Sequence, residues 1–588
     1  MCSIFGYYKI KDNKIHRDFV SQSFNLMRHR GPDNENFIEV DEKVGLGHQR
    51  LAIIDTLKEA NQPMYRNSVF IVFNGQIYNY IELKKELEDN NIIFETKSDT
   101  EVLLKGLEFM GIKFLNKCNG MFAFALYNKV TKELILARDR FGVKPLHYTI
   151  EDGVLYFSSE IKPLAKIKNK LERNIKIYDS FIKDTATDFD EDTFLKDIYQ
   201  LKKGSYLICG TGNIKKNDWY FGDDFKFDLK IFKDDNATLD FAETLLSDAI
   251  DKRLRADVPV CITLSGGLDS TTIYTLCRER LKKDIKAFTF SHPGSGIDEY
   301  GKVNKLTASY NDTFHCVKSE YEQGYKEVEE ALYYLEFPIW NISGIAYMNI
   351  YKAVRDKGFV VVLEGHGSDE QLGGYPYMIR SAVFEYIRNI NFKDAAKIYK
   401  VLNETNNPYL YQKNSLLLLG SYFIKNVIFK RKLDVSFAKT IKEAFDYKVL
   451  PRILRTFDRL TMKNSVESRS PFMDYRIVEF FSKMPLRYKV SELGSKAILR
   501  QILRKYNKEF LYKNKAKIGF ACDLHAFFEV KENKEYMRGK IVKFNLKRYN
   551  WLKKKALQNI AKDNLSWIAT EPICKIASLS IMEEFYGI

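Results

Sequence analysis

The chain has 588 residues, which at about 100–200 residues per domain is enough for two to four domains with sizeable cores. Hydrophobic residues make up 45% of it and charged residues 29%, with only 13 prolines, a balance that excludes a largely disordered or collagen-like chain. Lys and Arg number 93 against 77 Asp and Glu, so the net charge is +16. This sign alone fits nucleic acid, anionic lipid or polyphosphate ligands.

The eight cysteines form no C-x-x-C pair and no metal-ligand spacing, which predicts reduced thiols in a cytoplasmic protein. No run approaches the roughly 18 uninterrupted apolar residues of a membrane span, and the N-terminus lacks the basic region and apolar stretch of a signal peptide. We therefore expect no transmembrane segment, and we interpret the interrupted apolar patch Ser415–Ile428 as a core helix.

Up to about residue 210 the sequence predicts an α+β or layered β structure of short strands separated by turns. The strand patterns lie at Val69–Phe73, Met121–Tyr127, Glu133–Ala137 and Leu155–Ser158. One predicted helix, Tyr80–Asn90, interrupts them. The following segment, Asp218–Asn236, is polar and aromatic without clean periodicity, which makes it the candidate linker between two halves.

The second half opens as an α/β unit with a helix, a strand, a glycine turn and another helix. These are predicted at Leu239–Leu254, Val258–Leu264, Ser265–Gly267 and Ser270–Leu281. Two more buried strands, Ala287–Ser291 and Phe359–Leu363, predict a parallel sheet. Beyond about residue 376 strand signals fade and helices dominate, for example at Ser381–Ile390, Ile453–Met462 and Ser495–Lys505.

The turn from Leu264 to Ser270 combines two glycines, two serines and Asp269 between a strand and a helix, where backbone N–H groups and the positive end of the helix converge. A phosphate would bind there, although the turn lacks the lysine and the spacing of the common P-loop. Asp269 would repel that phosphate unless a divalent cation bridged them, so Mg²⁺ is the expected companion. The alternative is an ordinary tight turn.

A second glycine-rich stretch, Glu364–Glu370, also follows an apolar strand, so both loops should meet at the same carboxyl edge of the sheet and define a cleft. Asp369 and Glu370 could hold the cation. His366 is the one side chain of this stretch able to exchange protons near neutral pH, and its alternative role is a loop histidine that binds backbone.

Cys2 becomes the first residue when the initiator methionine is removed, although a cysteine at position 2 is usually accidental. Its α-amine, with a pKa of about 8, could then take the proton of its thiol and create a nucleophile with its own base. Arg50 suits an α-carboxylate and Asp99 an α-ammonium, while Asn74 and the Gly75 N–H could form an oxyanion hole. Each alone has a structural alternative: an ion pair, a helix cap or a hairpin turn.

Together these motifs resemble the glutamine-hydrolysing asparagine synthetase family over nearly the whole chain. The glutaminase domain of that family, an N-terminal-nucleophile domain, is matched by Cys2–Gly6, Arg28–Asp33, Asn74–Asn79 and Gly120–Phe124. Its ATP-pyrophosphatase domain is matched by Ser265–Ser270, Gly367–Glu370, Val466–Asp474 and Lys496.

The resemblance implies an α+β glutaminase with layered αββα architecture in residues 1–215 and a linker in residues 216–238. Residues 239–588 would form an α/β parallel-sheet ATP-pyrophosphatase domain that is helical after about residue 376. It also implies a cytoplasmic enzyme, permits a homodimer and gives no reason to expect nucleic acid as a partner.

In the first domain, the resemblance implies that Cys2 attacks the side-chain amide of glutamine while Asn74 and Gly75 stabilise the oxyanion. Arg50 and Asp99 would hold the main-chain charges of the substrate, and glutamate and ammonia would result. The implied glutamine site comprises Arg50, Leu51, Ala52, Ile53, Ile54, Asn74, Gly75, Gln76 and Asp99.

In the second domain, the resemblance implies that ATP and Mg²⁺ activate a carboxylate as an acyl-adenylate, which ammonia then attacks after crossing a protein-lined passage. The implied catalytic residues are His366 and Lys496, and the implied metal ligands are Asp269 and Asp369. The implied ATP and pyrophosphate site comprises Leu264, Ser265, Gly266, Gly267, Leu268, Asp269, Ser270, Phe290, Glu364 and Gly365.

Three positions depart from the family pattern and leave the acceptor open. Glu364 stands where the family has serine, His366 where it has its catalytic glutamate, and Gln76 where glutamate is usual. The acceptor is therefore aspartate or another carboxylate, foremost a sugar uronic acid. Relatives that close β-lactam rings generally lack the nucleophilic cysteine, so Cys2 favours ammonia-dependent amidation.

Two alternatives belong to other functional classes. Residues 531–562 hold eleven Lys or Arg against two Glu, a net +9 interleaved with aromatic residues, which fits a nucleic-acid or membrane-surface binder or a simple solvated helical face. A relative that kept the fold and lost catalysis is the other alternative. The presence of Cys2, Asn74, Asp269, Asp369 and Lys496 argues against it.

Overall fold

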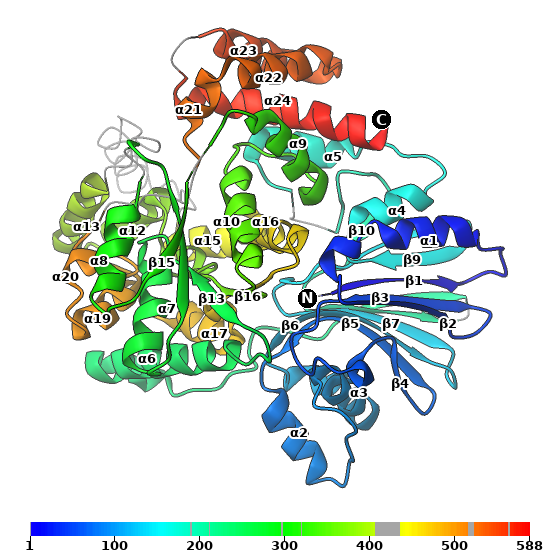
Figure 1. Ribbon diagram of the computed structural model, residues 1–588. Helices are drawn as coiled ribbons and strands as arrows, with labels where there is room; N and C mark the ends of the chain where they lie inside the picture. The colour runs from blue at the N-terminus through cyan, green and yellow to red at the C-terminus, as the bar shows by residue number, and fades with distance from the viewer. Residues whose placement is uncertain are drawn as a thin grey trace.

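The computed structural model describes residues 2–187, 191–210, 212–295, 298–318, 320–405, 436–515, 522–562 and 565–588. It consists of a β-rich N-terminal unit beside a parallel sheet that is surrounded by helices (Figure 1). The patch Ser415–Ile428, which we interpreted as a core helix, lies outside the described residues. Among the helices of the described ranges, none combines the length and the apolar character that crossing a membrane requires.

The N-terminal unit contains two six-stranded antiparallel sheets, ordered β10-β8-β9-β1-β3-β2 and β12-β11-β7-β6-β5-β4. The strands are β1 Ser3–Lys9, β2 Asn34–Glu39, β3 Val44–Arg50, β4 Met64–Arg66, β5 Val69–Ile77, β6 Gly120–Asn128, β7 Glu133–Arg138, β8 His147–Glu151, β9 Val154–Ser158, β10 Tyr199–Gln200, β11 Ser205–Gly210 and β12 Asn213–Asp218. The four strands predicted from sequence lie within β5, β6, β7 and β9, so these predictions are confirmed.

The two sheets pack face to face because alternate residues of each strand point to the same side. One core joins Ile4 of β1 to Val72 of β5 and Ala125 of β6 between the sheets. Two helices, α1 (Arg17–Asn25) and α4 (Ile161–Ile167), pack on the outer side of the first sheet. Helices α2 (Tyr80–Glu88) and α3 (Asp99–Met110) pack on the outer side of the second. The predicted αββα layering is confirmed (Figure 1).

The prediction of a single helix before residue 210 was wrong, since α1, α3, α4 and α5 (Ile175–Asp184) accompany α2. In α3 eight of the twelve residues are buried, so its apolar residues do not form the one-sided stripe that identifies a surface helix. Helix α4 has only seven residues, too few to establish a helical period.

The second unit is built on a five-stranded parallel sheet of order β15-β14-β13-β16-β17. Its strands are β13 Val260–Thr263, β14 Lys286–Ser291, β15 Phe314–Lys318, β16 Val361–Leu363 and β17 Glu467–Arg469. The predicted parallel sheet is confirmed. Strand β17 lies in the region where we expected helices to dominate. It was not predicted because a three-residue strand of Glu, Ser and Arg shows no apolar pattern.

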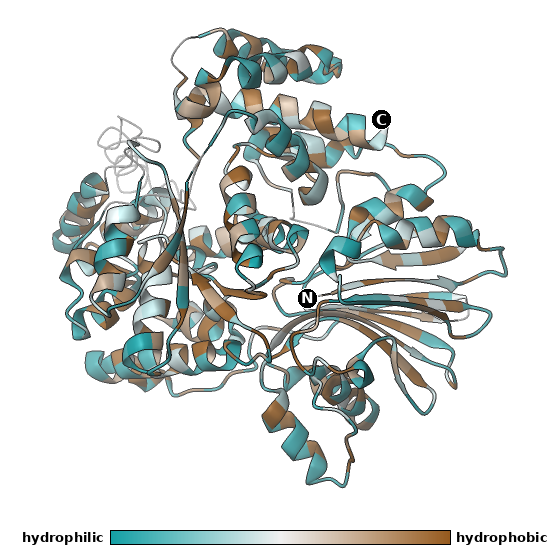
Figure 2. Cartoon of the chain, viewed as in Figure 1, coloured by the Kyte–Doolittle hydropathy of each residue, from teal (hydrophilic) through white to brown (hydrophobic). Residues whose placement is uncertain are grey.

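Helices cover both faces of this sheet, and Figure 2 shows apolar residues on the strands between them. Cys261 and Val362 point into one core, whereas their neighbours Ile262 and Leu363 point into the other. The first core contains α9 Gly324–Leu335, α10 Gly344–Asp356 and α16 Leu450–Lys463. The second contains α6 Asp235–Arg253, α7 Leu268–Glu279, α8 Tyr300–Ala308 and α19 Ala497–Lys505.

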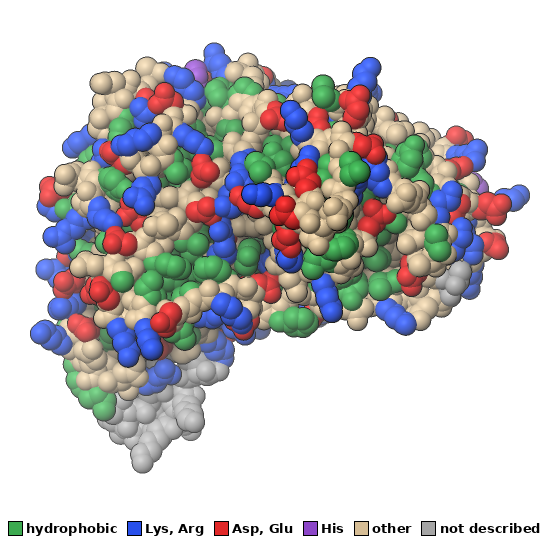
Figure 3. All heavy atoms as spheres, turned by 90° about the horizontal axis from the view of Figure 1, so that it is seen from below, with side chains coloured by type: hydrophobic (Ala, Val, Ile, Leu, Met, Phe, Trp, Pro, Cys, Tyr) green, Lys and Arg blue, Asp and Glu red, His purple; other side chains and the backbone are tan. Residues whose placement is uncertain are grey.

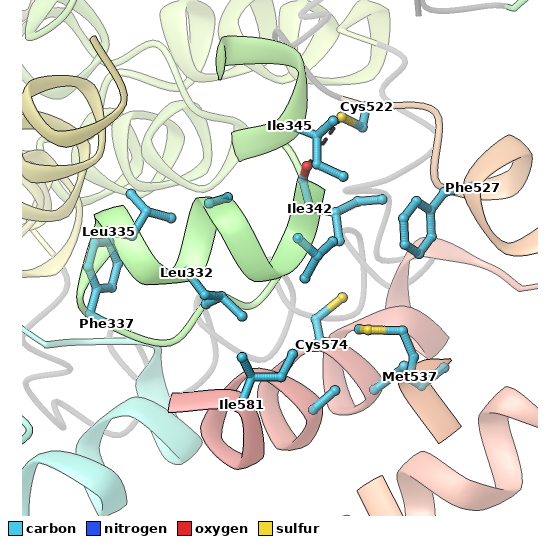
Figure 4. Close-up of a cluster of buried hydrophobic side chains, with 14 of the residues drawn as sticks. Leu332, Leu335, Phe337, Ile342, Ile345, Cys522, Phe527, Met537, Cys574 and Ile581 are labelled. Atoms are coloured by element: carbon cyan, nitrogen blue, oxygen red, sulfur yellow. Dashed lines mark hydrogen bonds between the residues drawn. The ribbon is translucent and has the colours of Figure 1, made fainter. Parts of the chain in front are cut away.

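The C-terminal region is helical as predicted, and its last helices are anchored in the first core. Figure 4 shows Phe527, Met537 and Ile581 packing toward Leu332 of α9 and Ile345 of α10. The remaining helices are α11 Ser368–Leu372, α12 Pro376–Arg388, α13 Phe392–Glu404, α15 Phe437–Glu443, α17 Tyr475–Lys483, α18 Leu486–Lys489, α20 Glu509–Tyr512, α21 Leu524–Glu529, α22 Lys531–Lys543, α23 Asn550–Ile560 and α24 Trp567–Tyr586.

Candidate active sites

The first candidate site surrounds Cys2, which is buried just before β1. Its backbone nitrogen lies 3.1 Å from Asn74 Oδ1, and its Sγ lies 4.0 Å from the carbonyl oxygen of Leu51. Burial raises the pKa of the Cys2 thiol, so the resting side chain is protonated and needs a base. Asn74 Nδ2 is buried and has no hydrogen-bond partner among the described residues. An unused amide donor beside a nucleophile is suited to binding an oxyanion.

Gly75 lies where β5 approaches β6 too closely for any side chain. A Cβ atom at this position would stand 2.2 Å from the carbonyl oxygen of Met121. The backbone N–H that sequence reasoning assigned to the oxyanion hole therefore lies in a place where only glycine fits.

Arg50 ends β3 and organises the loop that follows it. Its Nη1 donates to the carbonyl oxygen of Leu57 at 2.8 Å and to Asn61 Oδ1 at 2.7 Å, while Nη2 donates to the carbonyl oxygens of Ile54 and Asp55. These bonds shape the loop Leu51–Ile54 next to Cys2. The proposed contact of Arg50 with a substrate carboxylate stays a prediction.

Asp99 begins α3 and is buried, with its Oδ2 accepting a hydrogen bond from Ile77 N at 2.9 Å. Burial raises the pKa of Asp99 to about 7. A cationic ligand would favour the ionised carboxylate, as expected of a group that binds an α-ammonium. Beside it, Gln76 Oε1 accepts from Arg469 Nη2 at 3.3 Å, so this neutral residue contacts the second unit.

Arg30 connects the Cys2 site to the second unit, and sequence reasoning missed its partner. The Nε of Arg30 donates to the carbonyl oxygen of Cys2 at 3.2 Å, and Nη1 lies 3.0 Å from both Glu160 Oε1 and Asp458 Oδ2. Arg30, Glu160 and Asp458 are all buried. The motif Arg28–Asp33 marked Arg30, but no local pattern marked Asp458 on α16.

Strand β17 makes a second connection between the units. Glu467 pairs with Arg469 at 2.6 Å, and Arg469 reaches Gln76 of the first unit. Ser468 lies between these two residues and points to the opposite side of the strand, where its hydroxyl donates to Glu364. One strand therefore contacts both candidate sites.

The second candidate site lies at the carboxyl edge of the parallel sheet, where the two predicted glycine loops meet. Ser368 Oγ donates to Asp269 Oδ1 at 2.7 Å. Lys496 Nζ lies 2.6 Å from Asp269 Oδ2 and 2.7 Å from Asp369 Oδ1. Within the turn, Ser265 N donates to Ser270 Oγ at 3.2 Å. The prediction that both loops converge at this edge is confirmed.

The role of Asp269 and Asp369 as ligands of a nucleotide-borne Mg²⁺ stays a prediction. Across the described ranges, no group of three or more His, Cys, Asp or Glu is placed to hold a metal ion. The two carboxylates converge on Lys496, and with phosphate oxygens they would complete the oxygen ligand set that Mg²⁺ prefers. Glu370 accepts from Tyr375 Oη at 2.5 Å, and burial raises its pKa to about 7, which makes it a weaker ligand.

Three other residues of the implied nucleotide site have defined surroundings. Gly365 leaves no room for a side chain, since a Cβ atom there would lie 2.5 Å from the Cβ of Asp269. Phe290, near the carboxyl end of β14, packs into the hydrophobic core. Glu364 is buried and bonded to neighbouring side chains, among them Tyr351 at 2.5 Å. Their contacts with a nucleotide stay predictions.

The basic segment 531–562 folds as α22 and α23, and acidic residues outside the segment neutralise several of its cations. Lys540 pairs with Glu329 and Glu584, and Arg548 pairs with Asp179. Figure 3 shows the face seen from below in Figure 1, which lies opposite α22 and α23 and carries cations and acids interspersed. The binding function proposed for this segment stays a prediction.

Comparison with known proteins defines the class of this molecule. Residues 1–220 match the family model of a glutamine amidotransferase domain, and residues 242–583 match that of asparagine synthase. Together with the two sites, these matches define a glutamine-hydrolysing ligase with an ammonia-producing and an ammonia-using domain. The chain belongs to the glutamine-hydrolysing asparagine synthetase family, whose members use ATP as co-substrate.

The relatives carry two kinds of name. Asparagine synthetase [glutamine-hydrolyzing] 1 of Bacillus subtilis (strain 168) is 27% identical over 571 residues, covering 91% of this chain and 88% of its own. Amidase chry2 of Gibberella zeae is 27% identical over 567 residues, covering 84% and 83%. Putative asparagine synthetase [glutamine-hydrolyzing] 2 of Methanocaldococcus jannaschii is 31% identical over 419 residues, covering 66% and 78%.

The raised pKa of Asp99 predicts a pH dependence of glutamine binding. Because only the ionised carboxylate attracts an α-ammonium, and its pKa is about 7, we expect the KM for glutamine to be about tenfold higher at pH 6 than at pH 8. Steady-state glutaminase assays across this range check the prediction. An Asp99→Asn variant should show a high KM with little pH dependence, and a pH-independent KM in the unaltered enzyme would contradict the assignment.

Proposed function

We propose that this protein transfers ammonia from glutamine to a carboxylate that it first activates with ATP, and that the carboxylate is that of aspartate. The observation that carries the proposal is the presence of two equipped sites in two units that contact each other. Cys2 faces an unused amide donor of Asn74 in one unit, and Asp269, Asp369 and Lys496 converge in the other.

In the first site, Cys2 Sγ attacks the side-chain amide carbon of glutamine. When Cys2 is the first residue, its α-amine takes the thiol proton and returns a proton to the departing nitrogen, so the C–N bond breaks and ammonia leaves. Asn74 Nδ2 and the Gly75 N–H stabilise the oxyanion. Water then releases glutamate from the thioester.

In the second site, a carboxylate oxygen attacks the α-phosphate of ATP, and pyrophosphate leaves. The turn Ser265–Ser270 offers backbone N–H groups to the departing phosphates, and Lys496 supplies a positive charge. Mg²⁺ held by Asp269 and Asp369 would neutralise phosphate charge. Ammonia then attacks the acyl-adenylate, which yields the amide and AMP.

Ammonia has to travel between the sites without meeting bulk water, because at neutral pH free ammonia is mostly protonated and no longer nucleophilic. The units are joined by buried contacts of Arg30 with Asp458 and of Arg469 with Gln76, so part of the boundary between them is shielded from water. They support a protein-lined passage for ammonia.

A sugar uronic acid is the second candidate acceptor. It is favoured by the substitutions Glu364 and His366, which replace the family's serine and catalytic glutamate beside the reacting carboxylate. The names of the relatives, asparagine synthetases and amidases, are compatible with either acceptor.

A homodimer and a cytoplasmic location are also part of this proposal.

An acceptor panel tests the proposal. The full-length enzyme is incubated with ATP, Mg²⁺, ammonium chloride and one carboxylate at a time, including aspartate, glutamate and uronic acids. We expect aspartate to give pyrophosphate, AMP and a product one mass unit lighter than the acid, as amidation requires. If only a uronic acid were amidated, it would replace aspartate as the proposed acceptor. If none of the carboxylates caused pyrophosphate release, the proposal would be contradicted.

A further inference from the structure

A buried carboxylate and an imidazole lie beside each other at the edge where the two glycine loops meet. We propose that Glu364 and His366 act as one unit, in which Glu364 positions His366 and His366 takes the proton from the attacking ammonia nitrogen. The inference rests on the proposed function. It gives Glu364 a positioning role in place of the nucleotide contact that the resemblance implies.

The first observation is that protein groups already occupy both carboxylate oxygens of Glu364, which is 2% exposed. Oε1 accepts from Tyr351 Oη at 2.5 Å and from Thr263 Oγ1 at 3.2 Å. Oε2 accepts from Ser468 Oγ and faces His366 Nε2 at 3.0 Å. A carboxylate has about four lone-pair positions, so little capacity remains for a nucleotide hydroxyl.

The second observation is the orientation of the His366 ring. Its Nε2 lies 3.0 Å from Glu364 Oε2, but at an angle outside hydrogen-bond geometry. This does not exclude the pair, because catalytic hydrogen bonds often align only when substrate is bound. The ring of Phe457 lies against the imidazole, with centroids 3.5 Å apart, and Ser470 Oγ donates to the His366 carbonyl oxygen at 2.5 Å. When the Nε2 proton aligns with Glu364, Nδ1 keeps the free lone pair.

The charge of Glu364 suits this role. Burial opposes its ionisation, but His366, Ser468 and Tyr351 together hold its pKa below the usual value. The carboxylate is therefore an anion at neutral pH and would stabilise the imidazolium that forms when His366 accepts a proton.

The third observation is the position of this pair between the two sites. Gly365, the residue between Glu364 and His366, packs on Asp269 of the nucleotide loop. On the other side, Glu364 contacts Ser468, whose strand reaches the glutaminase unit through Arg469. Contacts therefore link this pair both to the nucleotide loop and to the strand that reaches the glutaminase unit.

The proposed step is balanced. The ammonia nitrogen bonds to the acyl carbon of the adenylate, and His366 Nδ1 accepts one proton from that nitrogen. The bond between the acyl carbon and the AMP oxygen then breaks, with its electron pair passing to AMP. The products are the amide, AMP and a protonated imidazole, which later releases its proton to water.

The variant Glu364→Gln distinguishes between a positioning role of Glu364 and a contact of Glu364 with the nucleotide. In ammonia-driven assays with the acceptor identified by the panel, we expect pyrophosphate release and the KM for ATP to stay near those of the unaltered enzyme. Amide formation should fall about tenfold or more, since the adenylate still forms but is hydrolysed instead. If pyrophosphate release and amide formation fell in parallel and the KM for ATP rose, Glu364 would contact the nucleotide and the proposal would be overturned.

Two controls keep the result interpretable. Glu327→Gln removes another carboxylate of this unit, one that accepts from Asn349 at 3.2 Å, and should leave the ratio of pyrophosphate to amide unchanged. Glutaminase activity reports whether each variant is folded. If the unaltered enzyme activates no carboxylate at all, the proposed function fails instead of this inference.

A spectroscopic measurement tests the pair without any acceptor. In ¹⁵N-histidine NMR spectra of the full chain, with the signals assigned by their absence in His366→Ala, we expect His366 to carry its proton on Nε2 at high pH. Glu364→Gln should lose this tautomer preference. A proton on Nδ1 in the unaltered protein would overturn the proposal.

Discussion

Cys2→Ala is expected to abolish glutamine-driven amide formation and to leave ammonia-driven amide formation unchanged. The thiol is the nucleophile of the first site alone, where its Sγ lies 4.0 Å from the carbonyl oxygen of Leu51, in the loop shaped by Arg50. The second site draws on Asp269, Asp369 and Lys496 of the other unit, where Lys496 pairs with both carboxylates. Ammonia supplied in the medium therefore bypasses the loss.

The measurement compares amide yield with glutamine and with ammonium chloride as nitrogen donors at one ATP concentration. Cys118→Ala is the matched control, since Cys118 is a buried free cysteine in the same unit and has no proposed catalytic role. It should keep both activities. Loss of both activities in Cys2→Ala, with Cys118→Ala active, would contradict the model of two separable sites.

Lys496→Met is expected to lower pyrophosphate release by about 10²–10³-fold while glutaminase activity persists. Lys496 is 3% exposed and its Nζ contacts both Asp269 and Asp369, so its removal takes away a phosphate-directed charge and leaves two carboxylates facing each other. The two half-buried carboxylates would then lack their cation, so the free energy of unfolding should also fall.

The variant also tests the metal assignment. Without the ammonium group, the paired carboxylates should bind a divalent cation more strongly, so Mg²⁺ should raise the melting temperature of Lys496→Met more than that of the unaltered protein. In the double variant Lys496→Met and Asp369→Asn, the extra rise in melting temperature caused by Mg²⁺ should be absent. Lys508→Met, at a half-buried lysine 4.0 Å from Glu279, is the control and should keep pyrophosphate release. An unchanged rate in Lys496→Met would contradict its assigned role.

The parallel sheet and its two glycine loops could be predicted because their signals are local. An apolar strand followed at once by glycines and a helix specifies where the loop lies, and parallel strands bring such loops to one edge. The contact of Ser368 with Asp269 confirms that reasoning. Strand β17 could not be predicted, since Glu467 and Arg469 are buried by pairing with each other and not by apolar character.

The resemblance implies a nucleotide contact for Glu364, whereas its contacts in the structure come from three different elements. The side chain contacts Tyr351 on α10, Ser468 on β17 and His366 on its own loop. The first two contacts depend on how a helix and a strand pack against the loop, which no pattern in residues 364–370 encodes.

The sequence by itself determined the division into an N-terminal-nucleophile glutaminase and a parallel-sheet synthetase, and it marked Cys2 as the candidate nucleophile and the turn around Asp269 as the candidate nucleotide site. These features depend on residue type and on spacing along a few neighbouring positions. Only the tertiary structure decided that Arg30 joins Cys2 to Asp458 and that Glu364 pairs with His366 beneath Phe457. The physical reason is that Arg30 meets Asp458 through the packing of elements that lie 428 residues apart in the chain. The neighbours Glu364 and His366 are held by Tyr351, Ser468 and Phe457, which belong to other elements packed against their loop.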